Sequence, residues 1–291
     1  MKLTCVTATF NCIKSGNRER LIRCIESVAK LQTEHEHLIY DGASADGTAD
    51  LLRELEKRIP CLKVVSEPDT GIYNALNKGV RDAKGEWFYV LGADDYISHP
   101  EVMDRLLLEE DEDTDVIVAE VERDAGFGFF HDMKDFETIF YHVPCSHQGI
   151  VTKTKVVRGF GGFNEKEYKI CADWEMMHKG HALGLKHHYV FESFAFYTSG
   201  GVSERPDGPV FAEMRRVIER QLGLSAKEAK RYWTKGFPSW QIIRRLLKHR
   251  DTTYNLAGKM FARRAVRYYL RTVFYPAVVV KRFICKVVVG R

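Results

Sequence analysis

The chain has 291 residues, of which 45% are hydrophobic and 29% are charged, values typical of a globular protein with a sizeable core. This composition excludes a fibrous protein, a disordered chain and a mini-protein. Lys and Arg outnumber Asp and Glu by 44 to 40, a formal net charge of +4 that as an average says little about partners.

Strand-like and helix-like segments alternate along the first hundred residues. The β-branched run 3–10 predicts a strand, and the spacing of Leu21, Ile25 and Val28 predicts a helix within 18–31. Further strands are predicted at 36–41, 62–66 and 86–91, and further helices at 48–58, 71–82 and 100–109, with Thr48 as a candidate N-cap. This alternation predicts βαβ units, hence an α/β fold with a mainly parallel central sheet flanked by helices.

The second half of the sequence is less regular. A strand is predicted at 115–122, a helix at 173–182 and strands near 186–198. From about residue 210 the segments become helical and basic. We therefore expect two parts, an α/β domain over 1–205 and a basic helical C-terminal region over 206–291.

The cysteines and the apolar runs indicate the compartment. Seven cysteines form no C-x-x-C pair and no Cys/His spacing of the zinc type, which favours reduced thiols in a cytoplasmic protein. The first residues lack the apolar core of a secretory signal, and the apolar run 275–280 is stopped by Lys281 and Arg282. We expect no spanning helix.

Polar residues follow each of the first four predicted strands: 9–11, 41–48, 67–71 and 92–95. In an open α/β sheet the ligand lies beyond the carboxyl ends of the strands, where the strand order reverses. One such segment alone is more often a turn or a helix cap. Four of them in register predict a binding site.

The usual phosphate-binding loops are missing from the sequence. No Gly-x-Gly-x-x-Gly follows the first strand, and no G-x-x-x-x-G-K-[ST] occurs. A nucleotide diphosphate would need another counter-charge. Asp94 and Asp95 can supply one by holding a divalent cation such as Mg²⁺, which takes one or two protein carboxylates and phosphate oxygens. The alternative is a pair of solvated turn acids.

Several motifs together resemble the family 2 nucleotide-sugar glycosyltransferases, which have the GT-A fold, over roughly residues 1–200. They are TATFN, DGASADGT at 41–48, SEPDTGIYNALNKG at 66–79, LGADD at 91–95, and the later HQGIV and CADWE. The resemblance implies an inverting transfer of a sugar from a nucleotide diphosphate sugar, most often a UDP-sugar.

The same resemblance assigns roles to individual residues. The metal pair would be Asp94 and Asp95 with Mn²⁺ or Mg²⁺, and because the motif reads Ala-Asp-Asp rather than Asp-x-Asp, Asp95 is the safer ligand. Asp41 would face the base. The other residues expected to bind the nucleotide sugar are Thr7, Thr9, Asn11, Ser44, Glu67, Asp69 and Asn77.

For the proton transfer the resemblance points to Asp173 of CADWE as the catalytic base, at a helix N-terminus that favours its ionised form. The alternative is a simple N-cap. Tyr73 and Trp174 could each offer a flat face to a sugar, although a core position is more usual. For other residues two interpretations stay open: His147 and Gln148 either border the acceptor or are structural, and Lys78 either meets phosphate or is solvated.

Charge is distributed unevenly along the chain. Residues 244–291 carry thirteen Lys or Arg and one acid, Asp251, for a net charge of +12, which leaves −8 for residues 1–243. Apolar and aromatic residues alternate with these arginines, a pattern typical of segments that bind an anionic membrane surface. The acceptor would then be a polyprenyl-linked or growing cell-surface polysaccharide glycan, and the protein peripheral at the inner face of the cell membrane.

Other interpretations of the tail and of the protein stay open. The tail could dock on its own acidic domain or form a homodimer contact, whereas no motif accompanies the charge that would indicate nucleic-acid binding. The alternative function is a non-catalytic nucleotide-sugar-binding or membrane-peripheral scaffold protein of the same fold.

Overall fold

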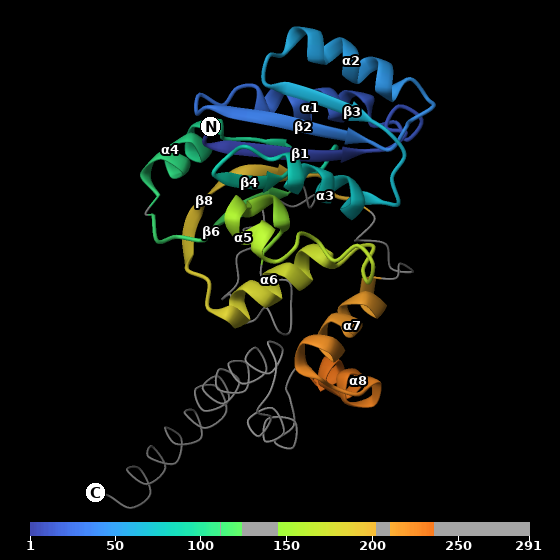
Figure 1. Ribbon diagram of the computed structural model, residues 1–291, viewed down its shortest axis with the longest axis vertical. Helices are drawn as coiled ribbons and strands as arrows, with labels where there is room; N and C mark the ends of the chain where they lie inside the picture. The colour runs from blue at the N-terminus through green and yellow to red at the C-terminus, as the bar shows by residue number, and fades with distance from the viewer. Residues whose placement is uncertain (111, 124–144, 202–209, 236–291) are drawn as a thin grey trace, which may run out of the picture.

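The computed structural model describes residues 1–110, 112–123, 145–201 and 210–235. Its described strands form one sheet in the order β3-β2-β1-β4-β7-β6-β8-β5 (Figure 1). The strands are β1 (Leu3–Thr9), β2 (His35–Asp41), β3 (Leu62–Ser66), β4 (Trp87–Val90), β5 (Tyr96–Ile97), β6 (Val116–Arg123), β7 (Ile150–Lys153) and β8 (His187–Tyr197).

Helices cover both faces of this sheet. They are α1 (Arg18–Val28), α2 (Thr48–Arg58), α3 (Ile72–Asp82), α4 (Pro100–Glu109), α5 (Thr154–Gly159), α6 (Ala172–Leu183), α7 (Val210–Leu222) and α8 (Ala226–Lys235), with a 3₁₀ turn η2 (His147–Gly149) before β7. In Figure 1, α7 and α8 lie beside α6, away from β1–β3.

The sheet is parallel over most of its pairings. Strands β1, β2, β3 and β4 run parallel, as do β6 and β8, whereas β7 lies antiparallel between β4 and β6, and β5 pairs antiparallel with β8. Strands β6 and β8 therefore run in the direction of β1–β4. The chain builds outward from β1 to β3 and then returns to β4 beside β1, so the strand order reverses between β1 and β4, where ligands bind in such sheets.

Alternate residues of each strand pack on opposite faces, because side chains of a strand alternate in direction. On one face, Val6 and Phe88 join a cluster with residues of α3, α5, α6 and α7. On the other, Cys5 and Trp87 pack with α1 and α4, and Ile39 packs with α1 and α2. The result is a sheet between two layers of helices.

The sequence-based elements are largely confirmed, with several short elements missed, among them β5, β7 and α5. The expected helices at 48–58 and 100–109 and the strand at 62–66 have the predicted bounds. Strands β5 and β7 have two and four residues and α5 has six, too few to show a periodic pattern. Thr48 is the first residue of α2 rather than its cap, which is Gly47 at φ 91°.

The expected boundary near residue 205 falls before α7. Met214, Val217 and Ile218 of α7 nevertheless lie in the same apolar cluster as Tyr73 of α3, so α7 shares the core of the α/β domain.

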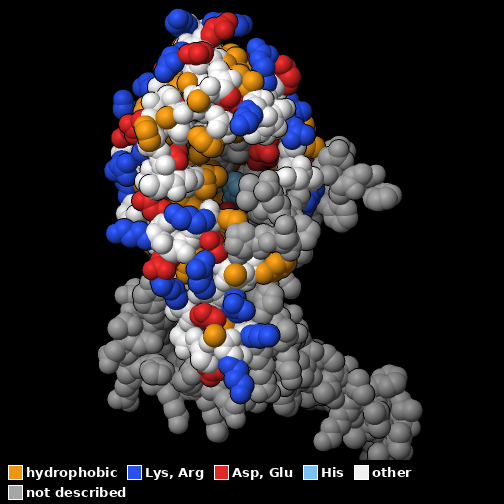
Figure 2. Space-filling view, turned by 90° about the vertical axis from the view of Figure 1, so that its right-hand side faces the viewer, with side chains coloured by type: hydrophobic (Ala, Val, Ile, Leu, Met, Phe, Trp, Pro, Cys, Tyr) orange, Lys and Arg blue, Asp and Glu red, His pale blue; other side chains and the backbone are white. Residues whose placement is uncertain are grey.

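On the described surface drawn in Figure 2, Lys and Arg side chains lie interspersed with Asp and Glu side chains. None of the helices in the described part of the chain combines the length and the apolar character that crossing a bilayer requires. The predicted basic tail, 244–291, lies outside the described residues.

Candidate active site

Asp41 joins the carboxyl ends of three strands. Its Oδ1 accepts hydrogen bonds from Thr9 Oγ1 (3.1 Å) and Ser44 Oγ (2.5 Å), and its Oδ2 accepts from Ser66 Oγ (2.7 Å) and the Ser44 amide (2.9 Å). The residue is buried. Asp41, Thr9 and Ser44 are thus brought together as predicted, in a network that fixes the ends of β1, β2 and β3.

Thr7 and Asn11 lie on either side of Thr9. Thr7 is buried within the sheet, where its Oγ1 donates to Leu91 O (2.9 Å) and lies 2.9 Å from His37 Nε2. The Asn11 amide donates to Ser44 Oγ (2.8 Å), and Asn11 Oδ1 accepts from the Ala45 amide (3.2 Å). Thr7 therefore links β1 to β2 and to the end of β4 inside the sheet. Asn11 holds the loop after β1 against the loop after β2.

An aromatic ring and an acid both lie close to Gly42 at this edge. A Cβ atom placed on Gly42 would lie 2.9 Å from Asp69 Oδ2 and 3.1 Å from Phe10 Cδ2. Asp69 Oδ1 accepts from the Gly71 amide at 2.9 Å. Phe10, at the end of β1, is 64% exposed. Sequence reasoning passed over Phe10, although an apolar residue directly after a strand at this edge is a signal.

Glu67 follows β3 and forms an ion pair with Lys78 of α3, with 2.7 Å between Oε1 and Nζ. Lys78 Nζ also donates to Pro68 O at 3.2 Å. Lys78 is thus not simply solvated. Its ammonium group bonds Glu67 and the Pro68 carbonyl, and so ties the loop after β3 to α3.

Asp95 is the most deeply buried acid after β4, with 2% of its surface exposed. Its Oδ1 accepts from the Thr198 amide (2.8 Å) and its Oδ2 from Gln148 Nε2 (2.6 Å). Burial, and then the charge of Asp94, raise the pKa of Asp95 to about 6, against the opposing hydrogen bonds. A positive charge at this position would therefore be strongly stabilising.

The oxygen atoms at this position fit a hard divalent cation. The half-buried Asp94 carboxylate makes no hydrogen bond or ion pair with the described residues, and the buried Gln148 Oε1 accepts none there. A Cβ atom on Gly92 would lie 2.4 Å from Asp95 Oδ2, so only glycine leaves room for the Asp95 carboxylate beside the backbone here. No cluster of three His, Cys, Asp or Glu occurs within the described ranges, but Mg²⁺ needs only one or two carboxylates besides substrate phosphates.

Asp173 lies in the first turn of α6, and one of its oxygens is anchored. Oδ1 accepts from Tyr73 Oη and from the Trp174 amide, both at 2.8 Å. Oδ2 lies 3.5 Å from His147 Nδ1, and the side chain is 28% exposed. The helix N-cap is Cys171, so Asp173 is not the cap. One oxygen is held and the other faces His147 and solvent.

Tyr73 holds Asp173 from α3. Its single hydroxyl hydrogen is shared between Asp173 Oδ1 and Ile170 O, which lies 2.5 Å from Oη. The ring stacks on Phe163 with 5.5 Å between centroids. Burial, followed by the negative charge of Asp173, raises the pKa of Tyr73 well above its ordinary value, so the hydroxyl remains a donor. Tyr73 and Trp174 are both buried, and the core interpretation of these two aromatics is correct.

Two consecutive residues connect the two acidic positions. His147 faces Asp173, and Gln148 donates to Asp95. Because neighbouring Cα atoms lie about 3.8 Å apart, the two acids border the same short segment, η2. The sequence pointed to this pair but left its role open.

Asn77, which the resemblance assigns to the nucleotide-sugar site, and Thr198, which sequence reasoning passed over, both bond to the backbone of neighbouring segments. Asn77 Nδ2 donates to Phe163 O (2.9 Å) and Oδ1 accepts from the Phe163 amide (2.8 Å), which ties α3 to the segment before α6. Thr198 Oγ1 donates to Asp94 O (2.6 Å). Thr198 directly follows β8 at the same edge of the sheet, so the strand-end rule could have found it.

Comparison with known proteins adds to this geometry. A model of the family described as "Glycosyl transferase family 2" matches residues 4–165, more than half of the chain. The PGL/p-HBAD biosynthesis glycosyltransferase of Mycobacterium bovis is 29% identical over 161 residues, which are 52% of this chain and 60% of that protein. The chain thus spans about three fifths of the length of the curated relatives that it matches in this way.

Solved structures resemble the fold. S. aureus TarS (residues 1–349), in complex with UDP, superposes with a TM-score of 0.61 at 16% identity and covers 94% of this chain and 73% of its own. The mannosyltransferase PcManGT from Pyrobaculum calidifontis, in complex with GDP-Man and Mn²⁺, has a TM-score of 0.53 at 14% identity, with 98% and 80% covered.

Proposed function

The chain belongs to glycosyl transferase family 2 and has the GT-A fold, and we propose that it moves a sugar from a UDP-sugar to an acceptor hydroxyl with inversion at the anomeric carbon. The observation that carries this proposal is the pair of acids, Asp95 and Asp173, on either side of His147 and Gln148. Asp95 is suited to hold a cation for the diphosphate, and Asp173 is suited to act as the base for the acceptor hydroxyl.

The nucleotide would bind at the ends of β1, β2 and β3. The exposed Phe10 ring offers an apolar face there beside Asp69 and Gly42, and aromatic faces stack on planar ligands. Asp41 would act through the strand ends that it holds together, since its oxygens already accept four hydrogen bonds. Asn11, Ser44 and Glu67 complete the proposed donor site.

Asp95, Asp94 and the Gln148 amide oxygen would hold Mn²⁺ or Mg²⁺. Such an ion, when bound, supplies positive charge to the departing diphosphate. The protein keeps Asp95 in place through Thr198 and Gln148 and keeps water from most of its surface. Support comes from the buried, unpartnered oxygen of Gln148 and from PcManGT, which was solved with Mn²⁺.

Asp173 would remove the proton of the attacking hydroxyl. Its Oδ1 is fixed by Tyr73 and the Trp174 amide, so Oδ2 has a defined direction, as general-base catalysis requires. The acceptor hydroxyl oxygen forms a bond to the anomeric carbon, and the hydroxyl proton passes to Asp173 Oδ2. The bond between the anomeric carbon and the diphosphate oxygen breaks, and the nucleotide diphosphate leaves. Attack opposite the leaving group inverts the configuration.

We also propose that residues 244–291 bring this site to an anionic membrane, where a polyprenyl-linked or growing polysaccharide glycan would be the acceptor. The support is the net charge of +12 interspersed with apolar residues. Deletion of 244–291 should abolish flotation with liposomes containing anionic lipid. Unchanged flotation would show that the tail does not bind the membrane.

The experiment for the enzymatic proposal is a screen of UDP-sugars that measures UDP release while Mn²⁺ and Mg²⁺ are varied. Asp95→Asn should remove the metal-dependent release, and Asp173→Asn should lower kcat at least a hundredfold. Asp50→Asn is the matched control, because Asp50 is exposed and its partner among the described residues is Arg53, on the surface of α2. Undiminished release by Asp95→Asn would refute the metal role, and binding of UDP without turnover by wild type would favour the scaffold function.

A further inference from the structure

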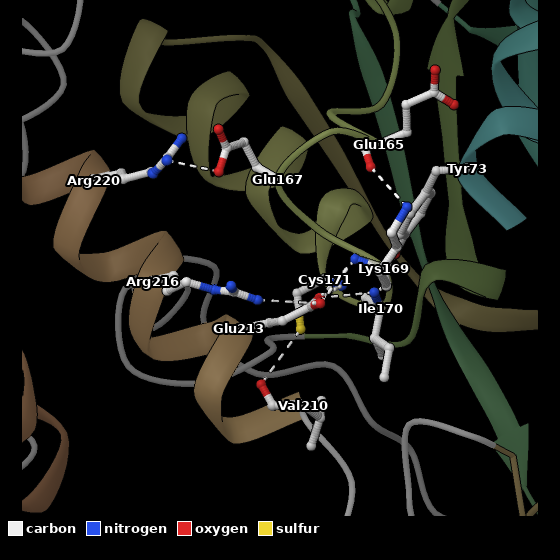
Figure 3. Close-up of polar contacts among 10 residues, drawn as sticks. All are labelled: Tyr73, Glu165, Glu167, Lys169, Ile170, Cys171, Val210, Glu213, Arg216 and Arg220. Atoms are coloured by element: carbon white, nitrogen blue, oxygen red, sulfur yellow. Dashed lines mark hydrogen bonds and ion pairs between the residues drawn. The ribbon is translucent and has the colours of Figure 1, made fainter. Parts of the chain in front are cut away.

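Glu213 of α7 is buried against the segment that leads into α6. It is 2% exposed, and its carboxylate accepts hydrogen bonds from the amides of three consecutive residues, Lys169, Ile170 and Cys171 (Figure 3). The distances to Oε2 are 3.1, 2.8 and 3.0 Å, and the Lys169 amide also lies 2.9 Å from Oε1. Arg216 Nη2 lies 3.4 Å from Oε1.

The three amides lie directly before the helix that carries Asp173. Cys171 is the N-cap of α6 and has no side-chain cap, so the first free N–H groups of the helix need acceptors. Glu213 supplies one from another helix for the amide of the N-cap residue Cys171 itself, the group that a local Glu or Gln accepts from in a capping box. The start of α6 is thereby fixed relative to α7.

The same segment reaches Asp173 by a second route. Ile170 donates its amide to Glu213, and its carbonyl accepts from the Tyr73 hydroxyl at 2.5 Å. That hydroxyl also lies 2.8 Å from Asp173 Oδ1. A shift of residues 169–171 would therefore move both the helix turn that bears Asp173 and the hydroxyl that orients it.

An amide cannot replace the Glu213 carboxylate in this position. A carboxylate only accepts hydrogen bonds, whereas the NH₂ group of glutamine only donates. Glutamine would keep one acceptor oxygen and turn a donor toward the Lys169 amide and Arg216. Hydrogen bonds to an ionised group are also the stronger ones, so the segment would have to move or lose partners.

We propose that Glu213 is a positioning residue for the transfer reaction, which holds Asp173 in its working place through residues 169–171. The inference rests on the proposed function of Asp173 as the base. It also assigns a role in the reaction to α7, a helix beyond the expected end of the catalytic domain at residue 205. Other links between α7 and this region are Arg220 with Glu167 (2.6 Å) and Gln221 with Glu175 (3.1 Å).

The test is Glu213→Gln, assayed with the UDP-sugar that wild type hydrolyses fastest, together with the affinity for UDP by calorimetry. We expect kcat to fall at least tenfold while KM for the donor and Kd for UDP stay within twofold, because the donor site lies on other elements. Glu219→Gln is the matched control on the same helix, where the ion pair of Glu219 within the described part of the chain is with Arg215 (3.6 Å), and it should behave as wild type. A kcat of Glu213→Gln within twofold of wild type would overturn the inference.

A double-mutant cycle separates positioning from a general loss of structure. In the Asp173→Asn background, Glu213→Gln should lower the residual rate less than twofold, because residues that act through one another are not additive. A further fall equal to that in wild type would overturn the inference. If Glu213→Gln no longer binds UDP, Glu213→Asp, which keeps the charge, is judged by the same two criteria.

The cycle also distinguishes the two proposals. Full activity of Asp173→Asn alone refutes Asp173 as the base and hence the proposed mechanism. A strongly reduced rate of Asp173→Asn combined with a normal Glu213→Gln leaves that mechanism intact and refutes only the role of Glu213.

Discussion

Replacing Tyr73 by Phe removes one oxygen atom from the support of Asp173 and leaves the ring in place. The ring stacks on Phe163, so packing is preserved. The lost hydroxyl lies 2.8 Å from Asp173 Oδ1 and 2.5 Å from Ile170 O. A hydrogen bond to a charged group contributes about 1.5–3 kcal/mol, and about 1.4 kcal/mol corresponds to a factor of ten. If most of this energy serves to orient Asp173, kcat should fall roughly 10- to 150-fold.

The assay is UDP release at saturating donor, with KM for the donor measured alongside and thermal unfolding as a check on folding. KM should stay within twofold, because the Tyr73 hydroxyl bonds Asp173 and Ile170, neither of which belongs to the proposed donor site. Tyr40→Phe is the matched control, since the Tyr40 hydroxyl donates to Asp82 at 2.5 Å in the same apolar cluster but away from Asp173. A kcat within twofold of wild type for Tyr73→Phe, or an equal loss in both variants, would refute the role given to this hydroxyl.

Three further predictions follow from individual contacts. Gln148→Leu removes the donor to Asp95 and the buried amide oxygen, so the Mn²⁺ concentration for half-maximal UDP release should rise at least tenfold; an unchanged value contradicts the proposed ligand. Asn77→Ala removes two hydrogen bonds to the Phe163 backbone and should lower the free energy of unfolding in urea by roughly 1–3 kcal/mol, and no loss would show that they contribute nothing. Burial, and then His35, lower the pKa of His37 from 6.5 to about 3. The free energy of unfolding therefore falls as the pH is lowered from 6.5 toward 3. His37→Gln should reduce the slope of this free energy against pH between pH 6 and 5 by about 1.2 kcal/mol per pH unit. An unchanged slope would mean that His37 is not buried as neutral imidazole.

The strand-end rule explains how much of the site could be read from the sequence. It correctly brought Thr9, Asp41 and Asp95 to one edge, because β1, β2 and β4 run parallel. It also applies to Thr198, but only once β8 is known to run in the direction of β1, and that depends on the antiparallel β7 between β4 and β6. A four-residue strand gives too weak a pattern for this step.

The direction of side chains was harder to predict than their position. Thr7 and Thr9 lie two residues apart and therefore on the same face of β1, yet Thr7 is bonded inside the sheet to Leu91 O and Thr9 to Asp41 at its edge. Whether a polar side chain faces a ligand or satisfies a buried partner depends on how far the strand extends beyond its neighbours. The spacing of residues in a single sequence does not reveal how far a strand extends beyond its neighbours.

The different surroundings of the two acids support different chemical roles for them. Asp95 is almost fully buried and both its oxygens accept from neutral groups, Gln148 and the Thr198 amide, so the charge of its ionised form needs compensation from a cation. Asp173 keeps 28% of its side chain exposed, with one oxygen anchored and the other directed toward His147. Environments that separate a pair of carboxylates in this way distinguish their functions. Because His147 and Gln148 are adjacent, a single peptide unit links the contacts of the two acids, while Tyr73 bonds Asp173 directly and Glu213 bonds the segment before it.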